Sequence, residues 1–310
     1  MTRTIALVGD GSNGWQAVIQ EILPNDAVVA WSRPSAQDAA VDYAIGWAPP
    51  AQVFAHFPRL KAIFALGAGV DRFVGRDDVA STVRLIRLTD AGMAAQMVEY
   101  ALYGVLRYQR AMDVYESQQT RELWHAHPPR LPEAVRVGVL GLGEMGGQVA
   151  RALAERGYGV TGWSRSPKSI AGVRCLCGLD RLDGVLAASD VLINILPSTP
   201  ATRGLLNHVR LARLPSGAAL INAGRGDQVD LTALRSHLDS GHLRSALLDV
   251  FPVEPLPSDD PVWRHPKVRV TPHIAAETLK YPAAEQIAEK IRQLEAGESV
   301  AGEVVRERGY

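Results

Sequence analysis

The chain has 310 residues, a length for which two domains are expected. Hydrophobic residues make up 47% and charged residues 21%, as in globular proteins, and the net charge at neutral pH is zero. Such a balance creates no long-range field for a polyanion, so we expect no nucleic-acid or membrane partner. Every apolar run is too short for a signal peptide or a membrane span, and we therefore expect a cytoplasmic protein.

The first third of the chain alternates short apolar runs with turn residues. Strands are predicted at Thr4–Val8, Val28–Trp31, Tyr43–Trp47, Ile63–Leu66 and Val83–Leu88, and a helix at Trp15–Leu23. Strands that alternate with helices form a parallel sheet with helices on both faces. The sequence therefore predicts a small doubly wound α/β domain.

A helical pattern fills the next stretch, from Ala94 to about Leu123. We predict one long helix there, which could connect two domains. The following loop contains His125 and His127, which are not part of a metal-ligand pattern, so we predict no metal site.

A glycine-rich turn opens the second half. The apolar run Val135–Leu140 leads into Gly141, Gly143 and Gly146, followed by a helical pattern and a second apolar run that ends at Trp163. Between a strand and a helix, this G-x-G-x-x-G spacing is typical of a dinucleotide site, because the helix N-terminus and the exposed backbone bind the pyrophosphate. The alternative is an ordinary strand–helix turn, which the flanking strands make less favourable.

The turn after Trp163 indicates which dinucleotide is bound. NAD sites usually place a carboxylate there to bind the ribose 2′-hydroxyl. Here the residues are Ser164, Arg165, Ser166 and Lys168. A guanidinium binds phosphate oxygens with two hydrogen bonds, so we expect NADPH in preference to NADH, against the alternative of a basic turn that contacts only solvent.

Further strands and helices alternate toward the C-terminus. Strands are predicted at Val191–Leu196, Ala218–Asn222, Ser245–Asp249 and Val268–Thr271, and helices at Leu179–Ala187, Asn207–Arg213, Leu231–Ser240 and Pro282–Glu295. Cys175 and Cys177 match neither a redox nor a zinc motif and are expected to be strand residues in a reducing compartment. If the last helix returns to the first domain, residues 1–95 and 276–310 form a discontinuous substrate-binding domain and residues 96–275 a dinucleotide-binding domain. The ligand site would then lie in the cleft between them.

Three polar residues follow predicted strands of the second domain, where open parallel sheets bind ligands. Arg225 lies between glycines and could bind a carboxylate. His273 could donate a proton, and Glu254 could stabilise its imidazolium form. Taken singly they could be a surface arginine, a structural histidine and a solvated acid; their combination favours an active site.

These segments together resemble the D-isomer-specific 2-hydroxyacid dehydrogenase family, and within it the group of glyoxylate and hydroxypyruvate reductases. The matching segments are Phe64–Asp71, Gly141–Gly146, Trp163–Lys168, Leu196–Pro197, Asn222–Gly226, Leu248–Pro257, Thr271–Thr278 and Arg308–Tyr310. The resemblance implies a flavodoxin-like and a Rossmann domain with an inter-domain cleft, and a homodimer. It also implies NADPH-dependent reduction of glyoxylate to glycolate and of hydroxypyruvate to D-glycerate.

The resemblance also implies roles for individual residues. Arg225 would bind the substrate, His273 would be the general acid and Glu254 its partner. The cofactor contacts would be Gly141, Leu142, Gly143, Glu144, Met145, Gly146, Trp163, Ser164, Arg165, Ser166, Lys168, Leu196, Pro197, Ala223, Gly224 and Asp249. The substrate contacts would be Trp47, Leu66, Gly67, Ala68 and Gly69, together with Arg225 and His273. Among these, Asp249 would contact the nicotinamide carboxamide.

Two alternative functions remain open on the sequence. Another 2-hydroxyacid dehydrogenase, such as phosphoglycerate dehydrogenase, would normally carry the NAD-type carboxylate that this chain lacks. A non-catalytic dinucleotide-sensing protein could share the fold, although the chain has no obvious interaction tail. Consumption of NADPH in the presence of glyoxylate distinguishes these possibilities.

Overall fold

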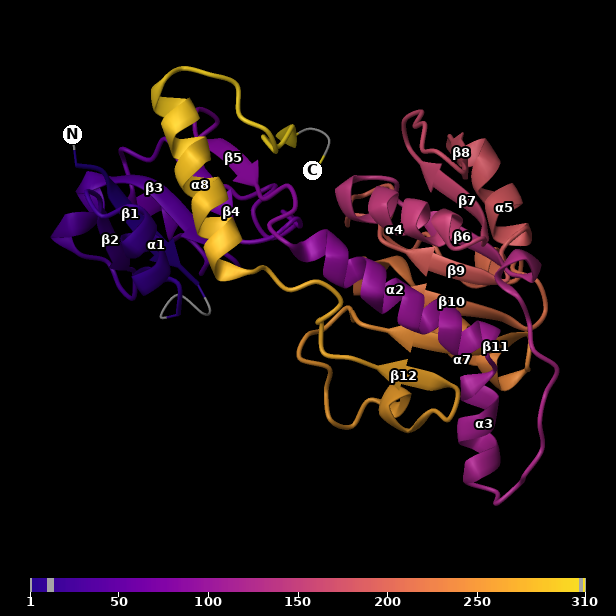
Figure 1. Cartoon of the computed structure of the whole chain (residues 1–310). Helices are drawn as coiled ribbons and strands as arrows, with labels where there is room; N and C mark the ends of the chain where they lie inside the picture. Colours follow the sequence, from indigo (N-terminus) through magenta and orange to yellow (C-terminus); the bar gives the residue numbers. More distant parts are fainter. Residues whose placement is uncertain (1, 10–13, 307–308, 310) are drawn as a thin grey trace. The chain divides into compact units, whose positions relative to one another are not determined.

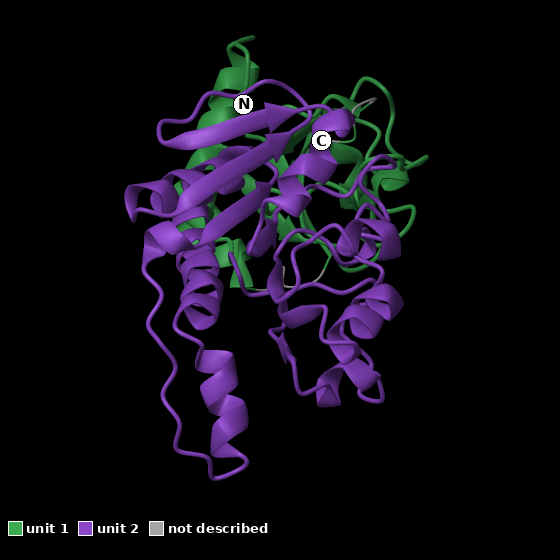
Figure 2. Ribbon diagram, turned by 90° about the vertical axis from the view of Figure 1, so that its right-hand side faces the viewer, with its two compact units in different colours: residues 1–93, 277–310 green, residues 94–276 purple. Residues whose placement is uncertain are grey.

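The computed structural model describes residues 2–9, 14–306 and 309, and the chain divides into two compact units. The first contains residues 1–93 and 277–310, and the second contains residues 94–276 (Figure 2). Arg308 and Tyr310 of the C-terminal segment fall outside the described residues. None of the helices in the described part of the chain is long and apolar enough to span a bilayer.

The first unit is built on a parallel sheet of five strands in the order β2-β1-β3-β4-β5 (Figure 1). The strands are β1 (Thr4–Val8), β2 (Ala27–Ala30), β3 (Val41–Gly46), β4 (Ala62–Ala65) and β5 (Arg84–Arg87), which confirms the predicted elements within two residues. This order is that of flavodoxin-like sheets, in which the chain reverses direction across the sheet between β1 and β3.

The C-terminal helix α8 (Lys280–Glu295) packs in this first unit, against α1 (Gln16–Ile22). It buries Ile287 and Ile291, and the Tyr43 hydroxyl on β3 donates a hydrogen bond to Glu295. The Lys290 ammonium donates to the Arg87 carbonyl at 2.7 Å. Helix α8 therefore contacts strands that lie more than 200 residues earlier in the chain.

The second unit contains a parallel sheet of seven strands in the order β12-β11-β10-β9-β6-β7-β8 (Figure 1). The strands are β6 (Arg136–Leu140), β7 (Gly159–Ser164), β8 (Val173–Cys177), β9 (Val191–Asn194), β10 (Ala218–Asn222), β11 (Leu243–Leu248) and β12 (Val268–Val270). The chain changes direction across the sheet between β6 and β9, the Rossmann arrangement, and ligands of such sheets bind beyond the strand ends at that point. Both expected sheet types are confirmed.

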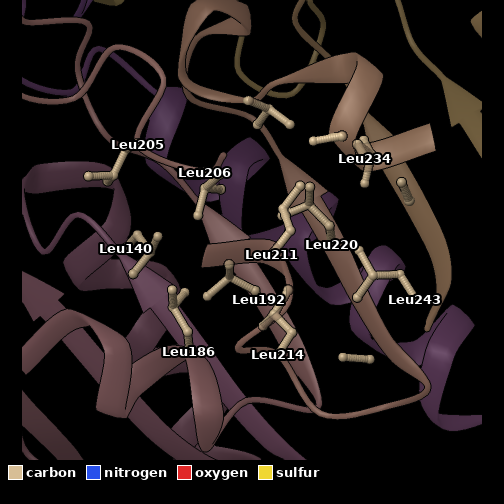
Figure 3. Close-up of a cluster of buried hydrophobic side chains, with 14 of the residues drawn as sticks. Leu140, Leu186, Leu192, Leu205, Leu206, Leu211, Leu214, Leu220, Leu234 and Leu243 are labelled. Carbon is tan, nitrogen blue, oxygen red and sulfur yellow. The ribbon is translucent and has the colours of Figure 1, made fainter. Parts of the chain in front are cut away.

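Helices cover both faces of this seven-stranded sheet. A leucine-rich cluster lies between the strands and α5 (Leu179–Ala187), α6 (His208–Leu211) and α7 (Leu231–Asp239) (Figure 3). Leu220 and Leu248 belong to this cluster, whereas Ile221 and Leu247 alternate with them along their strands and face α2 instead. At Gly104 of α2, a Cβ atom would lie only 2.4 Å from Ile221 Cδ1, so glycine permits this close packing.

The predicted long helix over 94–123 is wrong in one respect. The structure has two helices, α2 (Met93–Gln109) and α3 (Met112–Gln119), separated by Ala111 at φ 53°. The turn allows Asp113 of α3 to pair with Arg244 of β11, with Nε to Oδ2 at 2.7 Å, and Glu116 to pair with Arg269 of β12. Helical periodicity continues through both halves, so a single left-handed residue held by distant ion pairs is invisible in the sequence pattern.

Short 3₁₀ helices and the remaining α-helix complete the described elements. They are η2 (Ala36–Ala40), η3 (Phe54–His56), η4 (Pro132–Ala134), α4 (Glu144–Glu155), η5 (Gly226–Gln228) and η6 (Pro261–Arg264). Cys175 and Cys177 are free thiols on β8, as expected for strand residues. Because all seven strands of the second unit are parallel, the loops that follow them lie along one edge of the sheet.

Candidate active site

The three glycines of the G-x-G-x-x-G turn differ in their conformation and surroundings. Gly141 has φ 100°, a conformation that L side chains rarely adopt. At Gly146, a Cβ atom would lie 1.8 Å from the Gly141 carbonyl oxygen, so the residue must be glycine for α4 to pack on the turn. At Gly143, a Cβ atom would meet nothing within 4 Å. Open space at the start of α4, where the first-turn amides lack intrahelical acceptors, fits a dinucleotide pyrophosphate.

The turn after β7 carries the residues expected to select the cofactor. Ser164 is buried, and its hydroxyl donates to the Ser166 carbonyl at 2.8 Å. Arg165, Ser166 and Lys168 are exposed. The Ser164 hydroxyl therefore closes the turn, while the two exposed cations provide the positive charge that suits a phosphate.

Glu254 and His273 form a direct pair, with His273 Nδ1 2.8 Å from Glu254 Oε2. The other carboxylate oxygen accepts the Phe251 N–H at 2.9 Å. Burial acts to raise the pKa of Glu254, but the hydrogen bonds from His273 and Phe251 and the charge of Arg225 outweigh it, so the pKa lies below its usual value. An ionised Glu254 accepts from Nδ1, so Nδ1 of His273 carries a proton.

The backbone of His273 is held in an uncommon conformation by Asp249. His273 has φ 57°, a left-handed conformation that costs a non-glycine residue about 1–2 kcal/mol. Its N–H donates to the Asp249 carbonyl at 2.9 Å. The buried Asp249 carboxylate accepts the N–H groups of Ile274 and Ala275, each at 2.9 Å. These bonds fix the turn that presents the imidazole.

The Asp249 carboxylate has a third donor. Thr271 Oγ1 lies 2.6 Å from Asp249 Oδ1 and 2.7 Å from the Tyr100 hydroxyl of α2. Since an ionised carboxylate only accepts, the single Thr271 proton points to Asp249 and Tyr100 donates to Thr271. Burial raises the pKa of Tyr100, which keeps it protonated as a donor. Tyr100 was not among the sequence-based candidates, because it lies within an otherwise regular helical pattern.

Arg225 follows β10 and is brought to the Glu254 loop by its neighbour. At Gly226, a Cβ atom would lie 1.9 Å from the Phe251 carbonyl carbon, so only glycine permits this contact between the two loops. Arg225 is half-buried, and its Nη1 donates to the Gly224 carbonyl at 2.8 Å. Its positive charge acts on Glu254. The structure thus brings together the three residues that the sequence offered separately.

The loops after β9 and β10 also lie against each other. A Cβ atom on Gly224 would lie 3.0 Å from the Leu196 nitrogen, and Leu196 and Ala223 are both buried. Beneath them lie three buried amide side chains that sequence reasoning missed, Asn194, Asn222 and Gln228. Asn194 Nδ2 donates to Asn222 Oδ1 at 2.8 Å. Asn194 and Asn222 are polar residues at the ends of buried strands, a feature that could have indicated them, whereas Gln228 ends the short helix η5.

In the first unit, the predicted substrate residues form a separate group. The Trp47 ring covers Gly67, where a Cβ atom would lie 2.7 Å from Trp47 Cζ3. The Leu66 N–H donates to the Gly46 carbonyl at 2.8 Å and the Gly67 N–H to the Ala65 carbonyl at 2.9 Å. These bonds occupy the N–H groups of Leu66 and Gly67, two of the residues expected to contact the substrate.

Metal ligation finds no support among the residues that the structure describes. Within them, no group of three or more histidine, cysteine or carboxylate side chains could hold a metal ion. The rings of His125 and His127 lie with their centroids 5.0 Å apart, and the His127 N–H donates to the Tyr115 hydroxyl at 2.9 Å.

Known proteins share both the sequence and the fold. The family model for the NAD-binding domain of D-isomer-specific 2-hydroxyacid dehydrogenases matches residues 102–275. Glyoxylate/hydroxypyruvate reductase A of Serratia proteamaculans is 44% identical over 301 residues, which is 96% of each chain.

Two solved structures extend the similarity to the whole chain. A D-isomer-specific 2-hydroxyacid dehydrogenase from Xanthobacter autotrophicus, in complex with NADPH and MES, is 43% identical with a TM-score of 0.95 over 100% of both chains. An NADPH-dependent glyoxylate/hydroxypyruvate reductase from Sinorhizobium meliloti, in complex with NADP and sulfate, is 31% identical with a TM-score of 0.94, again over 100% of both chains. The glycine turn, the residues at the strand ends and both sheets agree with these matches. The chain therefore belongs to the D-isomer-specific 2-hydroxyacid dehydrogenase family.

Proposed function

We propose that this protein uses NADPH to reduce small 2-oxoacids, with glyoxylate and hydroxypyruvate as substrates. The observation that carries the proposal is the 2.8 Å pair between Glu254 and His273, with the charge of Arg225 acting on Glu254. The Glu254–His273 pair supplies the proton for the carbonyl oxygen, and Arg225 supplies the group that binds the substrate carboxylate. The named activity of the Serratia and Sinorhizobium relatives supports the same reaction.

The reaction needs a bound carboxylate, a polarised carbonyl and a proton donor. Arg225 binds the substrate carboxylate through two parallel hydrogen bonds and draws electron density toward the carbonyl oxygen. His273 donates the Nε2 proton to that oxygen, and Glu254 stabilises the imidazolium from which the proton leaves. NADPH, when bound, supplies the hydride to the carbonyl carbon. The same residues acting in reverse would oxidise a 2-hydroxyacid.

The residues that would hold NADPH follow the strand ends of the second unit. Gly141–Gly146 would bind the pyrophosphate, and the cations of Arg165 and Lys168 the 2′-phosphate. The Asp249 carboxylate has about four acceptor positions, of which three are used within the protein, so one remains for the nicotinamide carboxamide. The NADPH and NADP complexes of the Xanthobacter and Sinorhizobium structures support this cofactor.

The proposal also assigns the substrate and the dinucleotide to different parts of the chain. Residues 1–95 and 276–310 would bind the substrate, and residues 96–275 the dinucleotide. In the first of these, Trp47 and the amides of Ala68 and Gly69 would contact the 2-oxoacid.

We also propose a cytoplasmic homodimer. Large apolar side chains are exposed on α2, on α3 and in the loop that follows: Tyr103, Leu106, Met112, Leu123 and Trp124. An exposed apolar patch of this kind is typical of a subunit interface. Light scattering coupled to size-exclusion chromatography tests this point, and a monomer at micromolar concentration would contradict it. Two reduced cysteines support the cytoplasmic assignment.

A panel of initial rates tests the proposed activity. NADPH and NADH oxidation would be measured at 340 nm with glyoxylate, hydroxypyruvate, pyruvate and 3-phosphohydroxypyruvate. We expect the highest kcat/KM with NADPH and glyoxylate or hydroxypyruvate. Preference for NADH with the phosphorylated substrate would favour a phosphoglycerate dehydrogenase. NADPH binding without turnover of any substrate would favour a dinucleotide sensor.

A further inference from the structure

Gln228 is completely buried at the end of η5, and every hydrogen-bonding position of its amide is used. Nε2 donates to the carbonyls of Leu196 at 3.0 Å and Pro197 at 2.8 Å. Oε1 accepts from the Arg225 N–H at 3.0 Å and from Asn194 Nδ2 at 2.6 Å. A primary amide has two donor protons and two acceptor lone pairs, so this side chain is fully satisfied.

The partners of Gln228 lie on two different loops. Leu196 and Pro197 follow β9, whereas Arg225 follows β10. A second buried amide reinforces the link, because Asn222 Nδ2 donates to the Arg225 carbonyl at 3.2 Å. The peptide groups on both sides of the Arg225 Cα atom are therefore held by side chains that do not reach the surface. Because the hydrogen bonds of Gln228 are all made within the protein, this side chain can act on a ligand only through the groups that it holds.

We propose that Gln228 is a positioning residue that couples cofactor binding to the substrate arginine. The inference rests on the proposed function, in which Leu196 and Pro197 contact NADPH and Arg225 contacts the 2-oxoacid. The Gln228 amide bonds directly to the main chain of all three residues. Because this amide is buried, it cannot replace a lost partner with water without a free-energy penalty. A cofactor that fixes the β9 loop therefore also fixes Arg225, and NADPH should tighten the binding of a substrate carboxylate.

Gln228→Met tests this coupling, because methionine keeps the length of the side chain and removes its four hydrogen bonds. The probe is oxamate, an unreactive analogue that carries the carboxylate and adjacent carbonyl of a 2-oxoacid. Calorimetry would give its Kd with and without saturating NADPH. In the wild-type enzyme we expect NADPH to lower the oxamate Kd by about 5- to 150-fold. In Gln228→Met the ratio should fall to within about threefold of unity, an estimate for loss of most of that coupling.

A matched control separates this role from a purely structural one. Gln118 of α3 is also buried, and its Nε2 donates to the His125 carbonyl at 3.1 Å. Gln118→Met should lower Tm but keep the wild-type oxamate ratio. If Gln228→Met lowers Tm and keeps that ratio, the residue is structural and the proposal is wrong.

A second variant covers the case in which Gln228→Met does not fold. Gln228→Glu is nearly isosteric but has at most one proton for the Leu196 and Pro197 carbonyls, so it should also weaken the coupling. An unchanged ratio in this variant would overturn the inference. Failure of the wild-type enzyme to oxidise NADPH with glyoxylate would instead overturn the proposed function, whereas an active wild type without an NADPH effect on oxamate would overturn only the coupling.

Discussion

The loop that carries Arg225 and the turn that carries Arg165 both follow strands of the same parallel sheet, yet their surroundings differ. The Arg225 backbone is held by two buried amides, and the adjacent Gly226 packs on the Glu254 loop. Arg165 lies in an exposed turn, in which the Ser164 hydroxyl donates to the Ser166 carbonyl. Two arginines at similar positions in the topology thus differ in exposure: Arg225 is half-buried, whereas Arg165 is exposed.

In the proposed function, the half-buried Arg225 acts on the substrate and the exposed Arg165 binds the cofactor. A group that acts on the reacting carbonyl must be placed within a fraction of an ångström, and buried hydrogen bonds provide that precision. A group that neutralises a 2′-phosphate needs only charge and reach, which an exposed side chain supplies. Substitutions of Arg225, of His273 or of the residues that hold them should therefore reduce turnover. Substitutions in the exposed turn after β7 should change which cofactor is used.

The largest effect is expected for His273→Ala. Loss of the general acid should lower kcat for glyoxylate by about 10²–10⁴-fold. The Kd of NADPH, measured from its fluorescence, should change little, because the imidazole is assigned to the substrate. A kcat within threefold of wild type would remove His273 from the mechanism, by the same scale.

Arg225→Ala should act on binding and turnover together. Loss of a charge-assisted, bidentate contact of about 3 kcal/mol corresponds to a decrease of about 10²-fold in kcat/KM. Arg203→Ala is a suitable control, since that exposed arginine pairs with Asp227 at 3.2 Å and has no assigned ligand. Equal losses in the two variants would contradict the role of Arg225.

In the exposed turn, Arg165→Ala should raise KM for NADPH by about 10- to 100-fold, the value of one charged hydrogen bond of 1.5–3 kcal/mol. KM for NADH should stay within about twofold, because NADH lacks the 2′-phosphate that the guanidinium would bind. Arg174→Ala, on the neighbouring strand β8, provides an exposed control that should change neither constant. A parallel rise for both cofactors would show that Arg165 does not select between them.

A smaller effect is expected for Thr271→Val, since Thr271 donates to the Asp249 carboxylate that holds the His273 turn. The substitution keeps the shape of the side chain but removes the donor to Asp249 and the acceptor for Tyr100. Loss of about 1 kcal/mol of positioning should lower kcat by about 5-fold, with the NADPH Kd unchanged. Tyr100→Phe should give the same direction of change, and a wild-type kcat in both variants would contradict the support of His273 through Asp249.

The smallest effect concerns the pH dependence of the Glu254–His273 pair. The folded-state pKa of Glu254 is depressed below 4.5, so its contribution to stability is complete above about pH 4.5 and is lost as pH falls through the folded-state pKa. Glu254→Gln should therefore lower Tm at pH 6, and the difference from wild type should shrink toward pH 3. A difference in Tm that stays constant over this range would contradict the ion pair.

Local sequence patterns were sufficient for most of the secondary structure. The spacing of Gly141, Gly143 and Gly146 predicted a turn whose geometry needs glycine at two of the three positions. Alternating apolar strands and helices predicted both parallel sheets. The break at Ala111 escaped prediction, because ion pairs with residues more than 100 positions away stabilise it.

The sequence by itself determined the element types, the glycine turn and the basic turn after β7, since each depends on neighbours in the chain. It also gave Arg225, Glu254 and His273 as candidates from their residue types. Only the tertiary structure decided that Glu254 meets His273, that Asp249 holds the histidine turn and that Gln228 joins two loops. These contacts join residues on different loops, and distances between loops follow from strand order and packing. The place of Arg225 beside the Glu254 loop therefore could not be predicted from residue type alone.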